Sequence, residues 1–307
     1  MKLVVALGGN ALMQRNEPLG MHVQWKNARM AADALAAVAR QHQLILTHGN
    51  GPQVGLLAMQ SEAFKGAEPY SFDVMGAATE GMIGYILEQE LGNILGYDVP
   101  IATLLTRVEV DAEDPEFSDP TKFIGPTFER EQIDALIAEY GWVFRQDGRK
   151  WRRVIASPQP KRILWHRPIR WLLDKGTVVI CGGGGGIPVA TKDGKTMVGV
   201  EAVIDKDRAS SLLATQIPAD LFIIATDVAG VFEHYDTPRQ RLLRRVTPSR
   251  LMSEQFAKGS MGPKIEAVSR FVMQTGKPGV IGSLSEIEAI VAGKAGTWIV
   301  PEDDGTE

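Results

Sequence analysis

The sequence predicts an α/β fold in which a mainly parallel sheet carries helices on both of its faces. Two observations lead to this prediction. Short apolar runs alternate with longer segments of helical periodicity, and several of the apolar runs end in glycine-rich turns. Since ligands of such sheets bind at the carboxyl ends of the strands, we expect these turns to converge on one crevice.

The first part of the chain supplies three predicted strands and two predicted helices. Residues 3–7 and 44–47 are apolar runs that stop at glycine turns, as expected of buried strands. Between them, residues 25–42 place small apolar side chains on one helical face. Residues 72–95 form a long helical segment with glycines that permit close packing, and residues 99–105 are expected to form the third strand.

The second part of the chain repeats the alternation. Its strands are expected at residues 178–181, 221–226 and 278–281, and its helices at residues 206–215 and 264–274.

Residues 111–157 interrupt the alternation. They begin with turn-forming sequences, and the apolar and aromatic runs 142–144 and 151–155 flank Asp147-Gly148, which is typical of a hairpin. We therefore expect a small subdomain that leaves the sheet and acts as a lid.

Composition excludes several classes of protein. The net charge of −4 argues against nucleic acid as a partner, so an anion site has to be local. The single cysteine, Cys181, excludes an intrachain disulfide and favours a reducing, cytoplasmic location. The five apolar residues after Lys2 are too few for a signal peptide, and no run approaches the ~18 apolar residues of a membrane span.

Two glycine turns follow the first two predicted strands and are suited to binding an anion. They are Gly8-Gly9-Asn10 and Gly49-Asn50-Gly51, whose backbone N–H groups can approach an oxyanion closely. Tight turns that bind nothing have the same composition. His48 precedes the second turn, but a histidine without a visible carboxylate partner is more often structural than an acid or base.

Two lysines stand at predicted helix starts, where the helix dipole adds to their charge. Lys206 is followed by Asp207, and with Asp205 this aspartate is placed to hold ammonium groups in a protonated state. Lys264 follows Gly262-Pro263. Each lysine alone is equally consistent with a solvated helix terminus. Together with the two glycine turns they favour phosphoryl transfer.

Other nucleotide-binding classes are disfavoured. The five glycines at 182–186 are followed by Ile-Pro-Val and not by a helix start, so they do not form a Rossmann fingerprint. The chain has neither a P-loop sequence nor the paired motifs of protein kinases.

The motifs resemble those of the carbamate kinases, a branch of the amino-acid kinase superfamily. The matching segments run in family order over nearly the whole chain: ALGGNAL (6–12), THGNGPQVG (47–55), EGMIGY (80–85), WRRV (151–154), SP (157–158), GGGGIP (183–188), VIDKD (203–207) and GSMGPK (259–264).

The resemblance implies a three-layer αβα sandwich around a mainly parallel open sheet of about eight strands, with a protruding lid. The chain would be a single amino-acid-kinase-type domain, residues 1–307. An N-terminal lobe, residues 1–175, would bind the small substrate and contain the protruding subdomain 111–157. A C-terminal lobe, residues 176–307, would bind the nucleotide. A homodimer is implied, with the helix around residues 80–85 at or near its interface.

The resemblance also implies an activity and its residues. The reaction would be reversible phosphoryl transfer between ATP and carbamate, run to make ATP from carbamoyl phosphate and ADP, with Mg²⁺ required and no protein metal cage. The implied catalytic residues are Lys206, Lys264, Asp207 and Lys122. The implied substrate-binding residues are Gly8, Gly9, Asn10, Gly49, Asn50 and Gly51. The implied nucleotide-binding residues are Lys206, Thr226, Asp227, Met261, Gly262 and Lys264.

The chain departs from the family pattern at several positions. Phe123 stands where proline usually follows the lid lysine, and Lys150 and Arg208 replace a glycine and an apolar residue. Residues 234–236 also differ from the usual loop near the adenine site. Two alternatives therefore stay open: a sister kinase acting on another small acid or phosphate, and a catalytically silent protein that binds nucleotide or carbamoyl phosphate.

Overall fold

The structure is a computed structural model that describes residues 1–8, 20–66, 68–192, 194–253 and 261–302. Its centre is an eight-stranded sheet with the order β15-β17-β16-β12-β1-β2-β9-β3, in which all neighbours are parallel except β16 and β17. The strands are β1 (Lys2–Leu7), β2 (Gln43–His48), β3 (Ile101–Leu104), β9 (Val178–Cys181), β12 (Leu221–Thr226), β15 (Arg245–Val246), β16 (Gly279–Ser283) and β17 (Thr297–Ile299).

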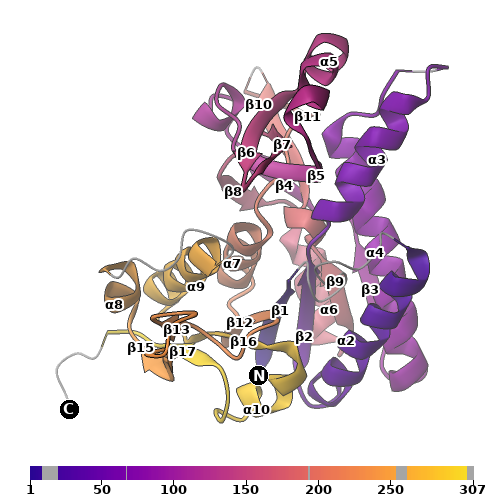
Figure 1. Ribbon diagram of the computed structural model, residues 1–307. Helices are drawn as coiled ribbons and strands as arrows, with labels where there is room; N and C mark the ends of the chain where they lie inside the picture. The colour runs from indigo at the N-terminus through magenta and orange to yellow at the C-terminus, as the bar shows by residue number, and fades with distance from the viewer. Residues whose placement is uncertain (9–19, 67, 193, 254–260, 303–307) are drawn as a thin grey trace.

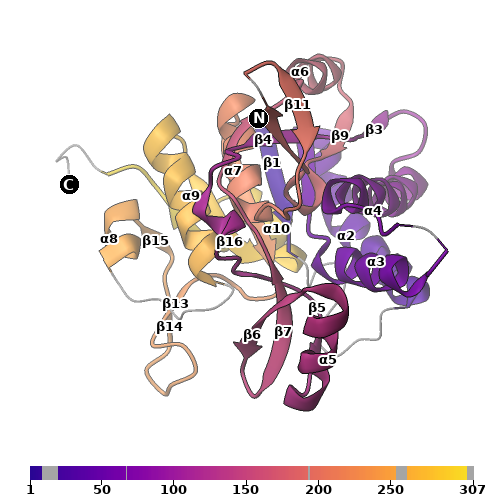
Figure 2. The ribbon, with the colours of Figure 1, turned by 90° about the horizontal axis from the view of Figure 1, so that it is seen from above.

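Helices cover both faces of this sheet, as Figures 1 and 2 show. One face carries α2 (Met21–Gln41), α4 (Phe72–Leu95) and α10 (Ile287–Val291), and the other carries α6 (His166–Asp174), α7 (Lys206–Gln216) and α9 (Met261–Thr275). Strand β1 illustrates why, because its residues are buried on alternate sides. Val4 and Ala6 belong to the core under α7 and α9, whereas Leu3, Val5 and Leu7 belong to the core under α2 and α4. The predicted three-layer α/β fold is confirmed.

Two smaller sheets stand above the carboxyl ends of the central strands, whereas β13 lies beside β15 and β17 (Figure 1). A four-stranded sheet has the order β11-β10-β4-β8, a three-stranded sheet has the order β5-β7-β6, and β13 pairs with β14. Their strands are β4 (Arg107–Val110), β5 (Lys122–Phe128), β6 (Val143–Asp147), β7 (Lys150–Ile155), β8 (Pro160–Ile163), β10 (Ile187–Lys192), β11 (Thr196–Gly199), β13 (Phe232–Glu233) and β14 (Arg241–Leu242). The remaining helices are α3 (Gly51–Ala63), α5 (Arg130–Tyr140), α8 (Pro248–Ser253) and three short 3₁₀ turns, Pro115–Phe117, Gly183–Gly185 and Leu284–Glu286.

The predicted hairpin at Asp147-Gly148 is confirmed, because β6 and β7 pair antiparallel on either side of it. Strand β5 joins the other edge of β7. Backbone contact fastens this three-stranded sheet to α3, since a Cβ placed on Gly55 would lie 2.3 Å from the Cα of Gly125. Only glycine permits that approach.

Several boundaries differ from the sequence prediction, and helix α2 begins at Met21, four residues before the predicted start at 25. Helix α9 is already formed at Met261, three residues before the predicted start at Lys264. Pro263 is compatible with this, since N–H groups in the first helical turn have no intrahelical acceptor. The third strand is limited to Ile101–Leu104 within the predicted 99–105. Within the described ranges, none of the helices combines the length and the apolar character that a membrane span requires.

Candidate active site

The predicted turns follow strands that are neighbours in the central sheet. Gly8 follows β1, Gly49 follows β2 and Thr226 ends β12, and these three strands lie side by side in the order β12-β1-β2. The N–H of Gly8 donates to the carbonyl of Ala225 at 2.9 Å, so the ends of β1 and β12 are in direct contact. Gly9 and Asn10, two of the predicted substrate-binding residues, lie outside the described residues.

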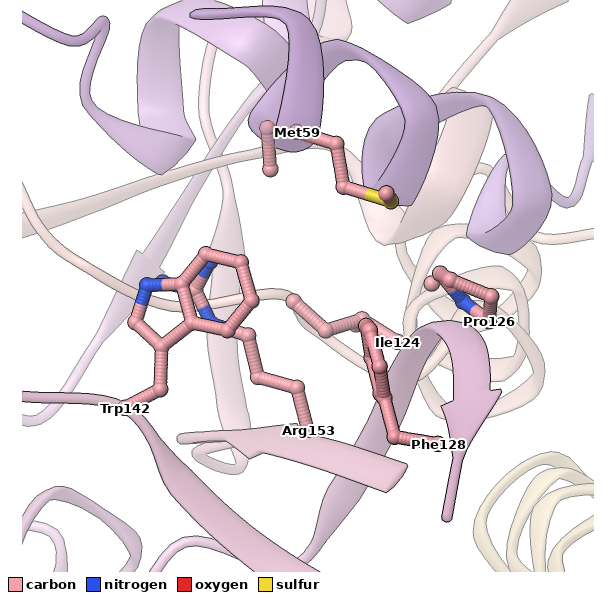
Figure 3. Close-up of a pocket in the computed structure, with 9 residues that line it drawn as sticks. Met59, Ile124, Pro126, Phe128, Trp142 and Arg153 are labelled. Atoms are coloured by element: carbon pink, nitrogen blue, oxygen red, sulfur yellow. The ribbon is translucent and has the colours of Figure 1, made fainter. Parts of the chain in front are cut away.

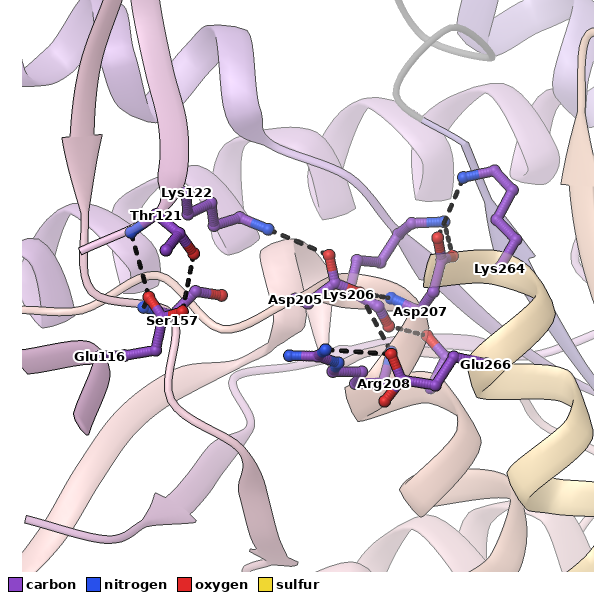
Figure 4. A network of polar contacts seen from close by, with 11 residues as sticks. Glu116, Thr121, Lys122, Ser157, Asp205, Lys206, Asp207, Arg208, Lys264 and Glu266 are labelled. Carbon is purple, nitrogen blue, oxygen red and sulfur yellow. Dashed lines mark hydrogen bonds and ion pairs between the residues drawn. The ribbon is translucent and has the colours of Figure 1, made fainter. Parts of the chain in front are cut away.

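One buried carboxylate holds two lysines at this edge of the sheet (Figure 4). Asp207 Oδ1 lies 2.6 Å from Lys206 Nζ, and Asp207 Oδ2 accepts a hydrogen bond from Lys264 Nζ at 3.0 Å. All three side chains are at most 12% exposed. Lys206 and Asp207 begin α7 and Lys264 lies in the first turn of α9, so two helices deliver two cations to one point.

Charges at this point are set by burial and by the ion pairs. Burial lowers the pKa of Lys206, although the carboxylate of Asp207 opposes that change. Burial alone would raise the pKa of Asp207, but Lys206 and Lys264 together hold it below its ordinary value. The carboxylate is therefore ionised at neutral pH and favours the charged form of both lysines.

Asp205 has a different role from Asp207, although the sequence suggested that both hold the same ammonium groups. Its side chain caps α7 by accepting hydrogen bonds from the N–H groups of Asp207 and Arg208. Its other oxygen, Oδ2, accepts a hydrogen bond from Lys122 Nζ at 3.2 Å. Burial would raise the pKa of Asp205, but the charge of Lys122 and the N–H of Arg208 hold it below its ordinary value.

Lys122 comes from the subdomain, and its side chain points toward Asp205 (Figure 4). It begins β5, whose base is fixed by Glu116: the carboxylate of Glu116 accepts from the N–H and hydroxyl of Thr121 and from the N–H of Ser157. An ion pair between Lys122 and Asp205 thus joins the subdomain to the start of α7, close to Lys206.

The turn after β2 is packed against α4 and the glycine loop. Asn50 is 4% exposed, and its amide Nδ2 donates to Thr79 Oγ1 at 2.9 Å. His48 is fully buried, which lowers its pKa to about 4 and keeps the ring neutral. Its Nδ1 lies 3.2 Å from the carbonyl of Gly49, and its Nε2 has no hydrogen-bond partner among the residues the structure describes. Gly49 and Gly51 are partly exposed, so their backbone is accessible.

The glycine loop, residues 182–186, is a site element that the sequence reasoning missed. It follows β9, the neighbour of β2. Its sequence ruled out a dinucleotide motif and matched a family motif, but indicated no role in the site. A Cβ placed on Gly184 would lie 2.1 Å from Asn50 Nδ2, and one on Gly185 would lie 2.5 Å from the carbonyl oxygen of Ile204. Five consecutive glycines directly after a strand were the available signal, because only bare backbone packs this closely.

The predicted nucleotide residues occupy two places. Thr226 is half-buried at the end of β12, and its hydroxyl donates to the carboxylate of the exposed Asp227 at 3.1 Å. Met261 and Gly262 are partly exposed in the first turn of α9, the same turn that carries Lys264.

A small pocket lies between α3 and the subdomain (Figure 3). Met59 lines it from α3, and Ile124, Phe128, Trp142 and Arg153 line it from the subdomain. The guanidinium of Arg153 stacks 4.0 Å from the Trp142 ring centre and pairs with Glu62 of α3 at 3.1 Å. These contacts fix the subdomain in the position from which Lys122 reaches Asp205.

The departures from the family pattern lie outside the Lys206–Asp207–Lys264 contacts. Arg208 pairs with Glu266 of α9 at 3.0 Å, and Lys150 pairs with Glu129 on the subdomain surface at 2.9 Å. Phe123 is 36% exposed on β5.

Comparisons with known proteins agree with this arrangement. A model of the amino acid kinase family matches residues 1–283. The chain is 56% identical over 301 residues to the carbamate kinase of Rhizobium meliloti, covering 97% of this chain and 93% of the relative. It is 53% identical over 297 residues to the carbamate kinase of Escherichia coli K12, covering 97% and 98%.

Solved structures give the same result. The structure of carbamate kinase from Giardia lamblia bound to AMP-PNP has a TM-score of 0.89 at 36% identity, covering 98% of both chains. An isopentenyl phosphate kinase substrate complex has a TM-score of 0.55 at 15% identity, covering 97% of this chain and 99% of the other, and it shows a shared fold alone.

Proposed function

Because this chain belongs to the amino acid kinase family and, within it, to the carbamate kinases, we propose that Lys206, Asp207 and Lys264 form its phosphoryl-transfer centre. The reaction is ATP + carbamate ⇌ ADP + carbamoyl phosphate. The observation that carries the assignment of the centre is the meeting of two ammonium groups on one buried carboxylate.

Phosphoryl transfer depends on position and charge more than on covalent help from the protein. We propose that Lys206 and Lys264 neutralise the charge on the moving phosphoryl group and on the leaving ADP. Asp207 keeps both lysines protonated and close together. Lys206 Nζ lies 2.6 Å from Asp207 Oδ1, and since an ammonium group has three N–H donors, this ion pair leaves two of them for phosphate oxygens.

The acceptor needs no general base, because the carbamate oxygen is already anionic. His48 fits this account: it is buried and neutral, and its pKa of about 4 makes it a poor proton acceptor near neutral pH.

The small anion would be held by backbone N–H groups of two turns and by the subdomain. We assign this role to the set predicted from sequence: Gly8, Gly9, Asn10, Gly49, Asn50 and Gly51. Since the side chain of Asn50 is occupied by Thr79, its own contribution would come from the backbone. Lys122 would add charge from above and exchange Asp205 for the substrate anion.

The nucleotide would lie on the other side of the two lysines. Thr226 and Asp227 at the end of β12, and Met261 and Gly262 beside Lys264, are the residues we assign to it. Support comes from the relative from Giardia lamblia, which was solved with AMP-PNP bound. In this arrangement residues 1–175 form the small-substrate lobe and residues 176–307 the nucleotide lobe.

We also propose that Mg²⁺ accompanies the nucleotide. Across the described parts of the chain, no group of three or more His, Cys, Asp or Glu side chains is arranged to hold a metal ion. The residues present therefore fit an ion carried mainly by phosphate oxygens, as is usual for Mg²⁺. When bound, the ion would neutralise phosphate charge alongside the lysines.

The homodimer and the cytoplasmic location stay proposals. The exposed face of α4 supports the first, because Tyr85 is 58% exposed there. Glu80, in contrast, is 1% exposed and turned inward, so it is not available to a partner. The second rests on the cysteine content, since the single cysteine, Cys181, is free.

One assay tests the activity and both alternatives. The unaltered protein is incubated with ADP, Mg²⁺ and carbamoyl phosphate, and ATP formation is followed, with acetyl phosphate and other acyl phosphates as a comparison panel. Formation of ATP with carbamoyl phosphate as the preferred donor supports the proposal. Preference for another donor would support a sister kinase, and nucleotide binding without turnover would support a silent binding protein.

A further inference from the structure

We propose that Glu80 is a positioning residue for phosphoryl transfer: its carboxylate holds the glycine loop 182–186, and the loop in turn holds the Asn50 turn and the start of α7. This inference rests on the proposed function, since it assigns those two segments to the reaction. It concerns a side chain in the middle of α4 that touches neither lysine.

The carboxylate of Glu80 connects three segments that are far apart in sequence. Its Oε1 accepts a hydrogen bond from the N–H of Gly183 at 2.9 Å, and its Oε2 accepts one from the N–H of Thr106 at 3.0 Å. The N–H of Gly182 donates in turn to the hydroxyl of Thr106 at 2.9 Å. Helix α4, the β3–β4 connection and the glycine loop are therefore tied together at one point.

The glycine loop lies against both segments that carry the chemistry. A Cβ placed on Gly183 would lie 2.2 Å from the His48 ring, and one on Gly184 would lie 2.1 Å from the amide of Asn50. On the other side, Gly185 approaches the carbonyl oxygen of Ile204, directly before Asp205. Since this backbone is in close contact on two sides, a shift of the loop would displace Asn50 and the start of α7 as well.

The buried N–H groups of Gly183 and Thr106 need acceptors, and Glu80 supplies one oxygen to each. Burying a charged or titratable group is costly, and burial raises the pKa of Glu80 to about 8 although N–H groups of Thr106 and Gly183 favour the charged form. An apolar side chain would avoid that cost but leave both N–H groups without an acceptor, and an amide would leave one of them. The two directed hydrogen bonds are what a carboxylate provides here and an apolar side chain cannot.

The test compares Glu80→Gln with Glu90→Gln. Glutamine keeps one acceptor oxygen but presents an NH₂ group to the second backbone N–H, so one of the two ties is lost. Glu90 is the matched control: it is a buried carboxylate of the same helix, 5% exposed, and pairs with Arg29 at 2.9 Å. It lies ten residues further along α4, about 15 Å from Glu80.

Three quantities are measured for the unaltered protein and both variants: kcat and KM for carbamoyl phosphate and ADP, the unfolding midpoint, and hydrogen exchange of a peptide that spans residues 182–186. We expect Glu80→Gln to lower kcat at least about tenfold, as small misplacements do. We expect faster exchange in the 182–186 peptide and an unfolding midpoint no lower than that of Glu90→Gln. Glu90→Gln should keep kcat and both KM values within about twofold of the unaltered protein, because Glu90 pairs with Arg29 and not with the glycine loop.

The positioning role is overturned if Glu80→Gln keeps kcat within about twofold, or if its kcat falls only together with a lower midpoint than the control. An unchanged exchange rate in the 182–186 peptide also overturns it, and this readout needs no activity. Failure of the proposed function is distinguishable, because then the unaltered protein itself forms no ATP from carbamoyl phosphate.

Discussion

Replacing Asp207 with asparagine removes the one charge that faces both lysines. The carboxylate oxygens lie 2.6 and 3.0 Å from the two Nζ atoms, so the ammonium groups are less than about 8 Å apart. At an effective dielectric constant near 20, two such charges repel by roughly 2 kcal/mol once the carboxylate is neutral. Breaking a buried ion pair by removing one partner costs about 3–5 kcal/mol, which for a chain of this length lowers the unfolding midpoint by roughly 5–8 °C.

The effect of Asp207→Asn on activity should exceed its effect on folding. With the lysines repelled from each other or deprotonated, we expect ATP formation from carbamoyl phosphate and ADP to fall on the order of 10²–10³ in kcat. The assay is run at 25 °C, after circular dichroism at that temperature has been used to verify that the variant is folded. Glu266→Gln is the control, because its ion pair with Arg208 at 3.0 Å is partly exposed and contributes less than about 1 kcal/mol. A kcat for Asp207→Asn within about tenfold of the control would refute the assignment.

Three further results are expected. Lys122→Ala should raise KM for carbamoyl phosphate at least about tenfold. It should cost less than about 1 kcal/mol of stability, because the ion pair between Lys122 and Asp205 is partly exposed. An unchanged KM in steady-state kinetics would argue against Lys122 as a substrate ligand. Gly184→Ala should reduce activity and folding yield far more than Gly194→Ala. Both glycines have positive φ, but only a Cβ on Gly184 would collide with another residue, Asn50. Equal effects of the two substitutions would show that backbone strain alone is responsible. For His48, the folded pKa of about 4 lies below the unfolded value near 6.5, so the folded state binds fewer protons and the free energy of unfolding should fall as pH drops from 6.5 to 4. The charge of Lys206 favours the same neutral form. His48→Gln should lose this part of the pH dependence in urea titrations, and an identical slope in the variant would contradict the burial of a neutral ring.

The sequence predicted best the elements that are held by local pattern and burial. The strands at 178–181 and 221–226 and the helix at 72–95 have the predicted bounds, because each is a continuous apolar run or a long periodic segment. Boundaries set by packing were predicted less well. The start of α9 is one example: Pro263 looked like a helix boundary but lies inside the first turn.

Long-range polar contacts are the part of the site that sequence patterns could not predict. Nothing in the spacing indicates that Asp207 faces two lysines while the adjacent Asp205 faces Lys122, because helix α7 directs the two side chains differently. The tie between Glu80 and Gly183 is equally absent from the sequence pattern, since these residues are 103 positions apart and β3, which follows α4, pairs with β9, which precedes Gly183. The motif resemblance named the glycine-rich segments, but their mutual packing follows from the sheet order.

The most direct measurement is the single-turnover rate of ATP formation by Lys206→Ala and Lys264→Ala with saturating ADP, Mg²⁺ and carbamoyl phosphate. If the two ammonium groups neutralise the transferred phosphoryl group, each variant loses on the order of 10²–10³ in rate while remaining folded. A rate near that of the unaltered protein in either variant would contradict the assignment of that lysine to the reaction.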